Sequence, residues 1–459
     1  MLVVWTHSRN NPTDIPVTNL SSLEQTSSFC KFRAKRGHLV QETARVTCIS
    51  RILEQSGGVK RIFYELNKSS KYRFQLFRFR RPERRFHELQ IKMNDASIPT
   101  MFQKTFVKHG IEICRHFDFK TLEAESKTWL CLMPIEKWEE SMYRRISKVL
   151  NIPSNRKQIL KLVKPLSLEI SSWNHDHYAI MENKSNFQES FCWTEQGTIN
   201  RLQTAKNILK TNLDIRRKFV LACMYFLEKD IKALWRQMTP SEKNSVKTVS
   251  DSLIVELWTD ALRKRRKFDW TLLGNKILSS DNSYDILDIS ISLPYFLKKL
   301  EADVGLHCFA TSINHRFLHP EQFRVCLLEL NRDQQMKIFG AYALKVLLYF
   351  LHWPHQEMFF DVAGIVMPYL SERDFFRFVH CIIREVIAKK WSDVDYVKLF
   401  KAFWQMSPDT FKENAKENEI YSSLLVVLGH NLDLESFPME QLLPNVAKCT
   451  SYDHPSYVA

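Results

Sequence analysis

Glycine is scarce in this chain: it supplies 10 of 459 residues, about 2% against an average usage of about 7%. Tight β-hairpins and loops that cradle phosphates need glycine, because the backbone there takes positive φ angles or approaches another group closely. Helices joined by short polar turns need far less of it. The composition therefore argues against an all-β fold or a nucleotide-binding α/β sheet and favours a mostly α fold.

A short phrase that ends an apolar, helix-periodic segment occurs twice. Residues 233–240 read ALWRQMTP, and residues 402–408 read AFWQMSP, one residue shorter. In the first copy Thr239 can cap a new helix, Pro240 suits its first turn, and Glu242 completes a capping box. Each copy therefore predicts a sharp joint between two neighbouring helices.

Related helix starts recur along the chain. Met367-Pro368 precedes Ser371, and Ser407-Pro408 is expected to cap another helix. The two prolines are 40 residues apart, within the range of about 34–47 residues for two-helix repeats. We therefore predict an irregular, α-solenoid-like array of antiparallel helical hairpins.

The clearest helical pattern lies between Asp214 and Met238, where apolar residues mark one face of a single long helix. After the joint, a second helix is expected to bury Val246 and Leu257 and to end in the basic run Arg263–Lys267. Cations are favoured at a helix C-terminus, and that is our interpretation of this run. A nuclear import signal is the alternative.

Four segments differ in composition. Residues 1–28 are rich in Ser, Thr, Asn and Pro and are interpreted as a flexible leader. A basic N-terminal region of mixed structure follows over 29–120. The helical-hairpin array is expected over 121–445, with a flexible tail over 446–459.

Positive charge is unevenly distributed over the chain. The formal net charge is +15, with +10 in residues 1–100, +7 in residues 201–250 and −4 in residues 401–459. A basic front end indicates an anionic partner. A solvated surface with a Lys and Arg bias is the plainer interpretation.

The ten cysteines include no Cys-x-x-Cys pair, and several lie within apolar helical runs. This usage is typical of a reducing compartment. The first residues do not read as a secretory signal. The most apolar stretch, Ile338–Leu370, is broken at Trp353-Pro354 and predicts two buried helices rather than a membrane span. We expect an intracellular protein, in the cytoplasm rather than the nucleus.

Aromatic and basic residues interleave over residues 71–86. Such a segment can contact phosphates through arginine and stack bases on phenylalanine. The alternative is an amphipathic element whose phenylalanines face the core. The candidate residues for binding an anionic partner are Arg73, Phe74, Phe77, Arg78, Phe79, Arg80, Arg81, Arg84 and Arg85.

Motifs that carry chemistry are not found. The sequence has no Gly-x-Ser-x-Gly, no P-loop and no His-Glu-x-x-His. His175-Asp-His177 and the pair His315 and His319 offer imidazoles, but a metal would need further ligands. Asp393 and Asp395 are interpreted as ordinary solvated carboxylates. We therefore predict no catalytic residue, no metal and no cofactor.

The segment over residues 216–238 resembles a recurring segment of large uncharacterised helical-repeat proteins of arachnids, and residues 401–408 resemble a worn copy of it. The resemblance covers about residues 200–270 and 320–430. It implies a helical repeat and carries no activity, cofactor or site residue with it.

Together these features predict a non-enzymatic helical scaffold that holds a protein or peptide partner in a groove between helices. The alternative is RNA or DNA binding through residues 71–86. The two hypotheses differ in salt dependence, because nucleic-acid binding through several basic contacts weakens steeply as salt rises.

Overall fold

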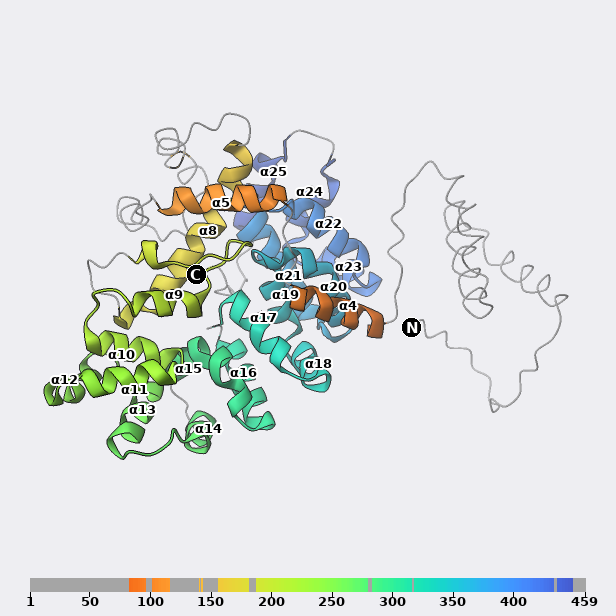
Figure 1. The fold of residues 1–459 in the computed structure, drawn as a ribbon. Helices are drawn as coiled ribbons and strands as arrows, with labels where there is room; N and C mark the ends of the chain where they lie inside the picture. Colours follow the sequence, from red (N-terminus) through yellow and green to blue (C-terminus); the bar gives the residue numbers. More distant parts are fainter. Residues whose placement is uncertain are drawn as a thin grey trace, which may run out of the picture. The chain divides into compact units, whose positions relative to one another are not determined.

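A computed structural model gives the fold of the chain, which divides into two units, Met1–Phe79 and Arg80–Ala459 (Figure 1). The expected leader, residues 1–28, and most of the basic region lie outside the residues that the structure describes. All described residues belong to the second unit. They are 82–95, 101–115, 140, 142, 156–180, 187–279, 283–315, 318–432 and 436–448.

Helices make up most of the described part of the second unit. Within it no β-strand occurs, and one isolated bridge joins Trp193 to Ile199. The prediction of a mostly α fold is confirmed. The helices are α4 (Pro82–Asp95), α5 (Met101–Arg115), α8 (Arg156–Asp176), α9 (Arg201–Ile208), α10 (Ile215–Met224), α11 (Glu228–Gln237), α12 (Pro240–Asn244), α13 (Leu253–Arg263), α14 (Trp270–Ser279), α15 (Ser283–Phe296), α16 (Ala302–His315), α17 (Pro320–Glu329), α18 (Arg332–Ala341), α19 (Ala343–Leu351), α20 (Phe359–Val366), α21 (Glu372–His380), α22 (Tyr396–Met406), α23 (Asp409–Asn414), α24 (Tyr421–Gly429) and α25 (Met439–Lys448).

Consecutive helices pack against each other as hairpins. The main pairs are α10 with α11, α15 with α16, α19 with α20, and α24 with α25 (Figure 1). Each pair shares one continuous apolar core with its neighbours. Stacked hairpins bury their apolar faces only against one another, and this arrangement is the predicted irregular array.

Two helices from the expected basic region are part of this array. Helix α4 packs against α17 and α20, and α5 lies along α8. Leu89 and Met93 of α4 are fully buried, and Lys92 pairs with Asp361 of α20. Helices α4 and α5 therefore belong to the helical body, and the chain divides between Phe79 and Arg80.

The prediction of one long helix between Asp214 and Met238 is wrong, because the helix is interrupted in the middle of this range. It breaks into α10 and α11 at Phe226, which has a φ of 49°. The amide of Leu227 donates to Ala222 O, and the amide of Phe226 donates to Cys223 O. These two bonds form a Schellman motif, the usual way to satisfy the last carbonyls of a helix.

The same motif closes two more helical segments without glycine. Arg265 (φ 51°) follows α13, and Lys390 (φ 53°) follows the π-helical turn Cys381–Ile387. At the first, Arg266 N donates to Ala261 O, and the equivalent bond at the second comes from Trp391 N. Larger side chains here occupy the left-handed position that glycine takes in most proteins. This is how a chain with few glycines still turns sharply.

The joints between hairpins follow the sequence signals in part. Thr239 Oγ1 accepts from the amide of Glu242, and the capping box is complete. However, α12 stops at Asn244 and α13 starts only at Leu253, so the single helix expected over Val246–Leu257 is wrong in its first half.

The other two starts differ in detail. Ser371 caps α21, as expected, by accepting from the amide of Asp374. Ser407 does not cap α23: its hydroxyl donates back to Phe403 O, and Pro408 occupies the N-cap position. The joint exists, but it closes the preceding helix rather than opening the next.

The apolar stretch Ile338–Leu370 is broken where expected. Helices α19 and α20 are separated at Trp353–Pro354, whose peptide bond is cis, and both helices are largely buried. In the described ranges we find no helix that combines the length and hydrophobicity required to traverse a lipid bilayer.

Candidate functional site

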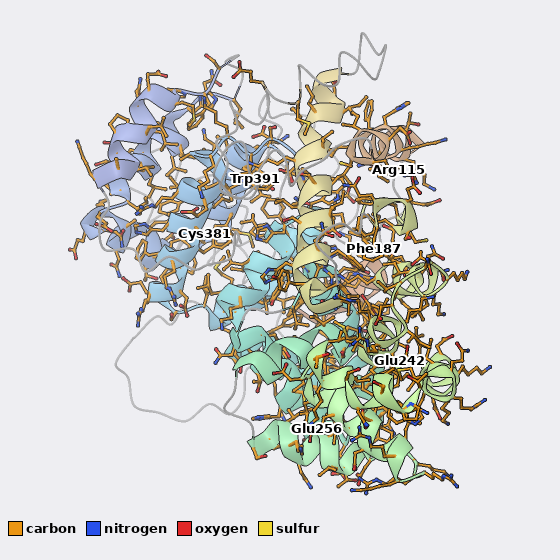
Figure 2. The ribbon with its side chains drawn as sticks, turned by 90° about the vertical axis from the view of Figure 1, so that its left-hand side faces the viewer. Arg115, Phe187, Glu242, Glu256, Cys381 and Trp391 are labelled. Atoms are coloured by element: carbon orange, nitrogen blue, oxygen red, sulfur yellow. The ribbon has the colours of Figure 1, made fainter. Side chains whose placement is uncertain are left out.

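Helix α8 runs through the body and directs polar side chains into it. In Figure 2 it is the long helix between the C-terminal helices and the helices of the first half. Lys164, Ser167 and Glu169 are buried beside Leu166 and Ile170. Burying ionisable groups costs free energy unless they are paired, so the role of this region depends on which groups these side chains are paired with. We call these residues of α8, with Asp176 and their partners, the α8 seam.

Glu169 occupies the centre of the seam. One carboxylate oxygen accepts from the amide of Ile199 at 3.1 Å, and the other lies 2.6 Å from His319 Nε2. The side chains of Glu169 and His319 are only 6% and 7% exposed. His319 Nδ1 accepts from the amide of Glu321 at 3.2 Å, so Nε2 carries the proton that is donated to Glu169.

The seam continues to the N-terminus of α17. Arg324 donates two hydrogen bonds to Glu321, at 2.6 and 2.8 Å, and a third to Met93 O of α4. Burial alone would raise the pKa of Glu321, but the hydrogen bonds from Arg324 and a long contact from His355 lower it to about 2. Burial, with His319 and His355 nearby, lowers the pKa of His352 to about 4.

Near its C-terminal end, α8 carries a buried ion pair. Arg201 of α9 lies 2.5 Å from Asp176 and also donates to Ser172 at 3.1 Å. The Arg201 side chain is 4% exposed. Desolvation of this guanidinium is offset by a charge-assisted hydrogen bond, which fixes α9 against α8.

His177 follows directly and is held as a neutral imidazole. Its ring stacks on Trp173 at 4.0 Å. Because Nδ1 lies 2.6 Å from Trp173 O, which can only accept, Nδ1 carries the proton and Nε2 accepts from Tyr225 Oη at 2.8 Å. Burial, and then the charge of Arg201, lower the pKa of His177 to about 4.

The middle of α8 meets the segment that precedes α22. Lys164 Nζ lies 4.4 Å from the centre of the ring of Trp391, the residue labelled in Figure 2. Asp393 accepts from Gln356 at 2.8 Å and from the Tyr396 hydroxyl at 3.0 Å. Burial raises the pKa of Asp393 to about 6. Asp393 is thus half-buried and hydrogen-bonded rather than an ordinary solvated carboxylate, whereas Asp395 is exposed and caps α22.

The seam brings charged groups together in closed pairs. Among the described residues, no group of three or more His, Cys, Asp and Glu is placed to hold a metal ion. His175 is exposed, while Asp176 and His177 face different partners. His319 is bound to Glu169, and the side chain of His315 lies outside the described residues. The chemistry that this arrangement supports is the fixing of α8 to the segments around it.

The predicted anion-binding segment, residues 71–86, lies mostly outside the described residues. Of its candidates, Arg84 and Arg85 are in the first turns of α4, and Arg73 to Arg81 are not described. Phe86, at its end, is 5% exposed; its ring meets Phe339 edge-on at 6.3 Å and is covered by Arg332. That last ring is core, as the amphipathic alternative expects.

A second basic region is exposed in the described body. The ends of α11 and α13 and the short α12 meet there, because Arg263 donates at 3.3 Å to both Lys243 O and Asn244 Oδ1. Glu242, labelled in Figure 2, marks α12 on the outside of the body. We call this surface the basic edge; its basic residues are Arg236, Lys243, Lys247, Arg263, Lys264, Arg265, Arg266 and Lys267.

Cations exceed anions on the basic edge. Residues 236–267, which contain it, carry 8 Lys and Arg against 4 Asp and Glu, a net charge of +4. Asp260 pairs with Lys264 at 2.8 Å and also with Arg266; hydrogen bonds from Lys264 outweigh desolvation and lower the pKa of Asp260. In the described body, no carboxylate is paired with Lys247, Arg265 or Lys267, and all three are exposed. The expected position of Arg263–Lys267 at a helix C-terminus is also observed.

Comparison with known proteins adds nothing to this description: no family model, no curated protein and no solved structure matches the chain. The resemblance to arachnid helical-repeat proteins stays a prediction. The site must therefore be interpreted from its own chemistry.

Proposed function

We propose that this protein is a non-enzymatic helical scaffold that holds a protein or peptide partner on its outer helices. The proposal is carried by the contrast between the interior and the surface. Glu169, Arg201 and their partners are paired inside the body and shielded from solvent. On the surface, by contrast, the basic edge presents cations that have no carboxylate partner in the described body.

A rigid frame is what such a function requires. The buried carboxylates of α8 contact other segments of the chain: Glu169 and His319 are 150 residues apart, and Asp176 and Arg201 are 25 apart. Contacts of this kind fix one arrangement of the hairpins. A binding surface that is already ordered loses less conformational entropy when the partner arrives.

We place the scaffold in a reducing compartment of the cell, in the cytoplasm rather than the nucleus. Cys114, Cys223 and Cys326 are buried as free thiols among apolar side chains. Burial raises the pKa of the Cys308 thiol to about 12, which keeps it protonated and unreactive. The basic run Arg263–Lys267 serves the C-terminus of α13, which supports the cytoplasm over nuclear import.

Selection from random peptides displayed on phage tests the proposal. The immobilised full chain should enrich peptides that bind saturably, compete with one another and survive moderate salt. A panel of single- and double-stranded RNA and DNA forms the second arm. If no peptide is enriched while oligonucleotides bind with a steep salt dependence, nucleic-acid binding through residues 71–86 replaces the scaffold proposal.

A further inference from the structure

We infer that the basic edge is the binding surface for an acidic polypeptide segment of a partner protein. The inference rests on the proposed scaffold function and names the chemistry of its partner. Its starting point is charge: Arg263 is bonded to the backbone of Lys243, and the exposed Lys247, Arg265 and Lys267 lie within four residues of one or the other along the chain. An anionic ligand is the complement of such a surface.

The backbone beneath these cations is fixed. The Schellman motif after α13 holds Arg265 at a φ of 51°, with Arg266 N bound to Ala261 O at 2.9 Å. Arg263 anchors the end of α13 to α12 through Lys243 O and Asn244. The cations therefore project from a defined turn, so a ligand meets charges that are already positioned.

The aromatic side chains of this region are buried or half-buried and pack on one another, which argues against bound nucleic acid. Phe226 lies at the centre of a ring cluster with Trp258, Phe268 and Trp270, at centroid distances of 5.3 to 6.1 Å. Trp235 packs on Phe219 at 5.4 Å. Single-stranded nucleic acid is bound in large part by bases stacking on exposed rings, and these rings are occupied with one another.

The presence of both positive and negative side chains on this surface also favours a polypeptide over a nucleic acid. Asp260 pairs with Lys264 and Arg266 within the basic edge, and Glu256 pairs with Lys276 close by. A nucleic acid carries a negatively charged phosphate at every nucleotide, so these carboxylates would repel it. A polypeptide can space its glutamates and aspartates to match Arg263, Arg265 and Lys267 and to avoid the acidic positions.

Fluorescence anisotropy on the full chain tests the inference. The probe is a labelled peptide in which glutamates alternate with serines, with the lysine–serine version as a control. The test variant is Lys247→Gln with Arg265→Gln and Lys267→Gln, three exposed positions that have no carboxylate partner among the described residues. The matched control variant is Lys299→Gln with Lys337→Gln and Lys416→Gln, which removes three exposed cations elsewhere.

We expect the test variant to bind the acidic peptide about 10-fold more weakly at low salt, because it lacks three exposed cations that would each pair with a glutamate. The control variant should bind as the wild type does. Equal binding by the test variant, or equal losses in both variants, overturns the inference. Tighter binding of an oligonucleotide that is lost in the same variant overturns it in favour of nucleic acid. If phage selection enriches peptides that are not acidic and do not respond to the variant, the scaffold proposal stands and this inference fails.

Discussion

The left-handed backbone of Arg265, after α13, allows a quantitative prediction about the free energy of unfolding. Arg265 has a φ of 51°, where a Cβ atom crowds the backbone and glycine does not. Replacement by glycine and replacement by alanine remove the same side-chain charge. The difference between Arg265→Gly and Arg265→Ala therefore isolates the backbone.

The magnitude follows from two opposing terms. A Cβ in the left-handed region costs roughly 1–2 kcal/mol, and glycine loses roughly 0.5–1 kcal/mol more conformational entropy on folding than alanine does. We expect Arg265→Gly to be more stable than Arg265→Ala by about 0.5–1 kcal/mol. Urea unfolding followed by circular dichroism measures the difference.

The preceding residue provides a matched control. Lys264 has a φ of −85°, an ordinary right-handed value. There the order should reverse, with Lys264→Gly less stable than Lys264→Ala by about 0.5–1 kcal/mol, because only the entropy term remains. If the alanine variant at position 265 is as stable as the glycine variant, the Schellman interpretation is wrong.

Three further predictions concern the core and the α8 seam. Phe226→Gly relieves a left-handed residue but removes a ring packed on Trp258 and Trp270, so it should destabilise the protein by about 2 kcal/mol or more in urea unfolding; no loss would contradict the ring cluster. The pKa of His177 is lowered to about 4, so the unfolded state binds its proton first. Stability from this group is complete above the unfolded pKa of about 6.5 and falls by about 3 kcal/mol as pH drops towards 4. The pH slope of the urea midpoint should therefore be shallower in His177→Gln, and an unchanged slope would contradict the burial. In Gly197→Ala the new Cβ would lie 2.6 Å from Leu166 at a φ of 83°, which should cost about 2 kcal/mol, whereas Gly429→Ala meets open space and should change the melting temperature little.

Local signals in the sequence predicted the local structure well. The scarcity of glycine indicated helices, and Thr239 with Glu242 formed the expected capping box. Trp353-Pro354 separated two buried helices as expected. These features depend on residues within a few positions of one another, so the sequence alone carries them.

The bend at Phe226 could not be predicted from the neighbouring residues. A Schellman motif is usually recognised from glycine, and here phenylalanine takes its place. The apolar period continues from α10 through Ile231 of α11, so the pattern reads as one helix. The ring cluster that stabilises the bend draws on Trp258 and Phe296, which come later in the chain.

The α8 seam was missed for a related reason. A charged residue such as Glu169 or Asp393 normally indicates a solvated surface. The buried position of Glu169 and the hydrogen bonds of Asp393 depend on partners such as His319 and Gln356, which are distant in sequence. The one clue was polar residues interrupting the apolar run from Leu160 to Ile170, which periodicity alone does not distinguish from a surface stripe.

Hydrogen–deuterium exchange of the full chain with and without the acidic peptide tests the central claim most directly. The account predicts slower exchange over residues 240–267, where α12 and the end of α13 carry the basic edge, and unchanged exchange along α8. Unchanged exchange at the basic edge, with protection appearing instead over residues 71–95 or within α8, would contradict it.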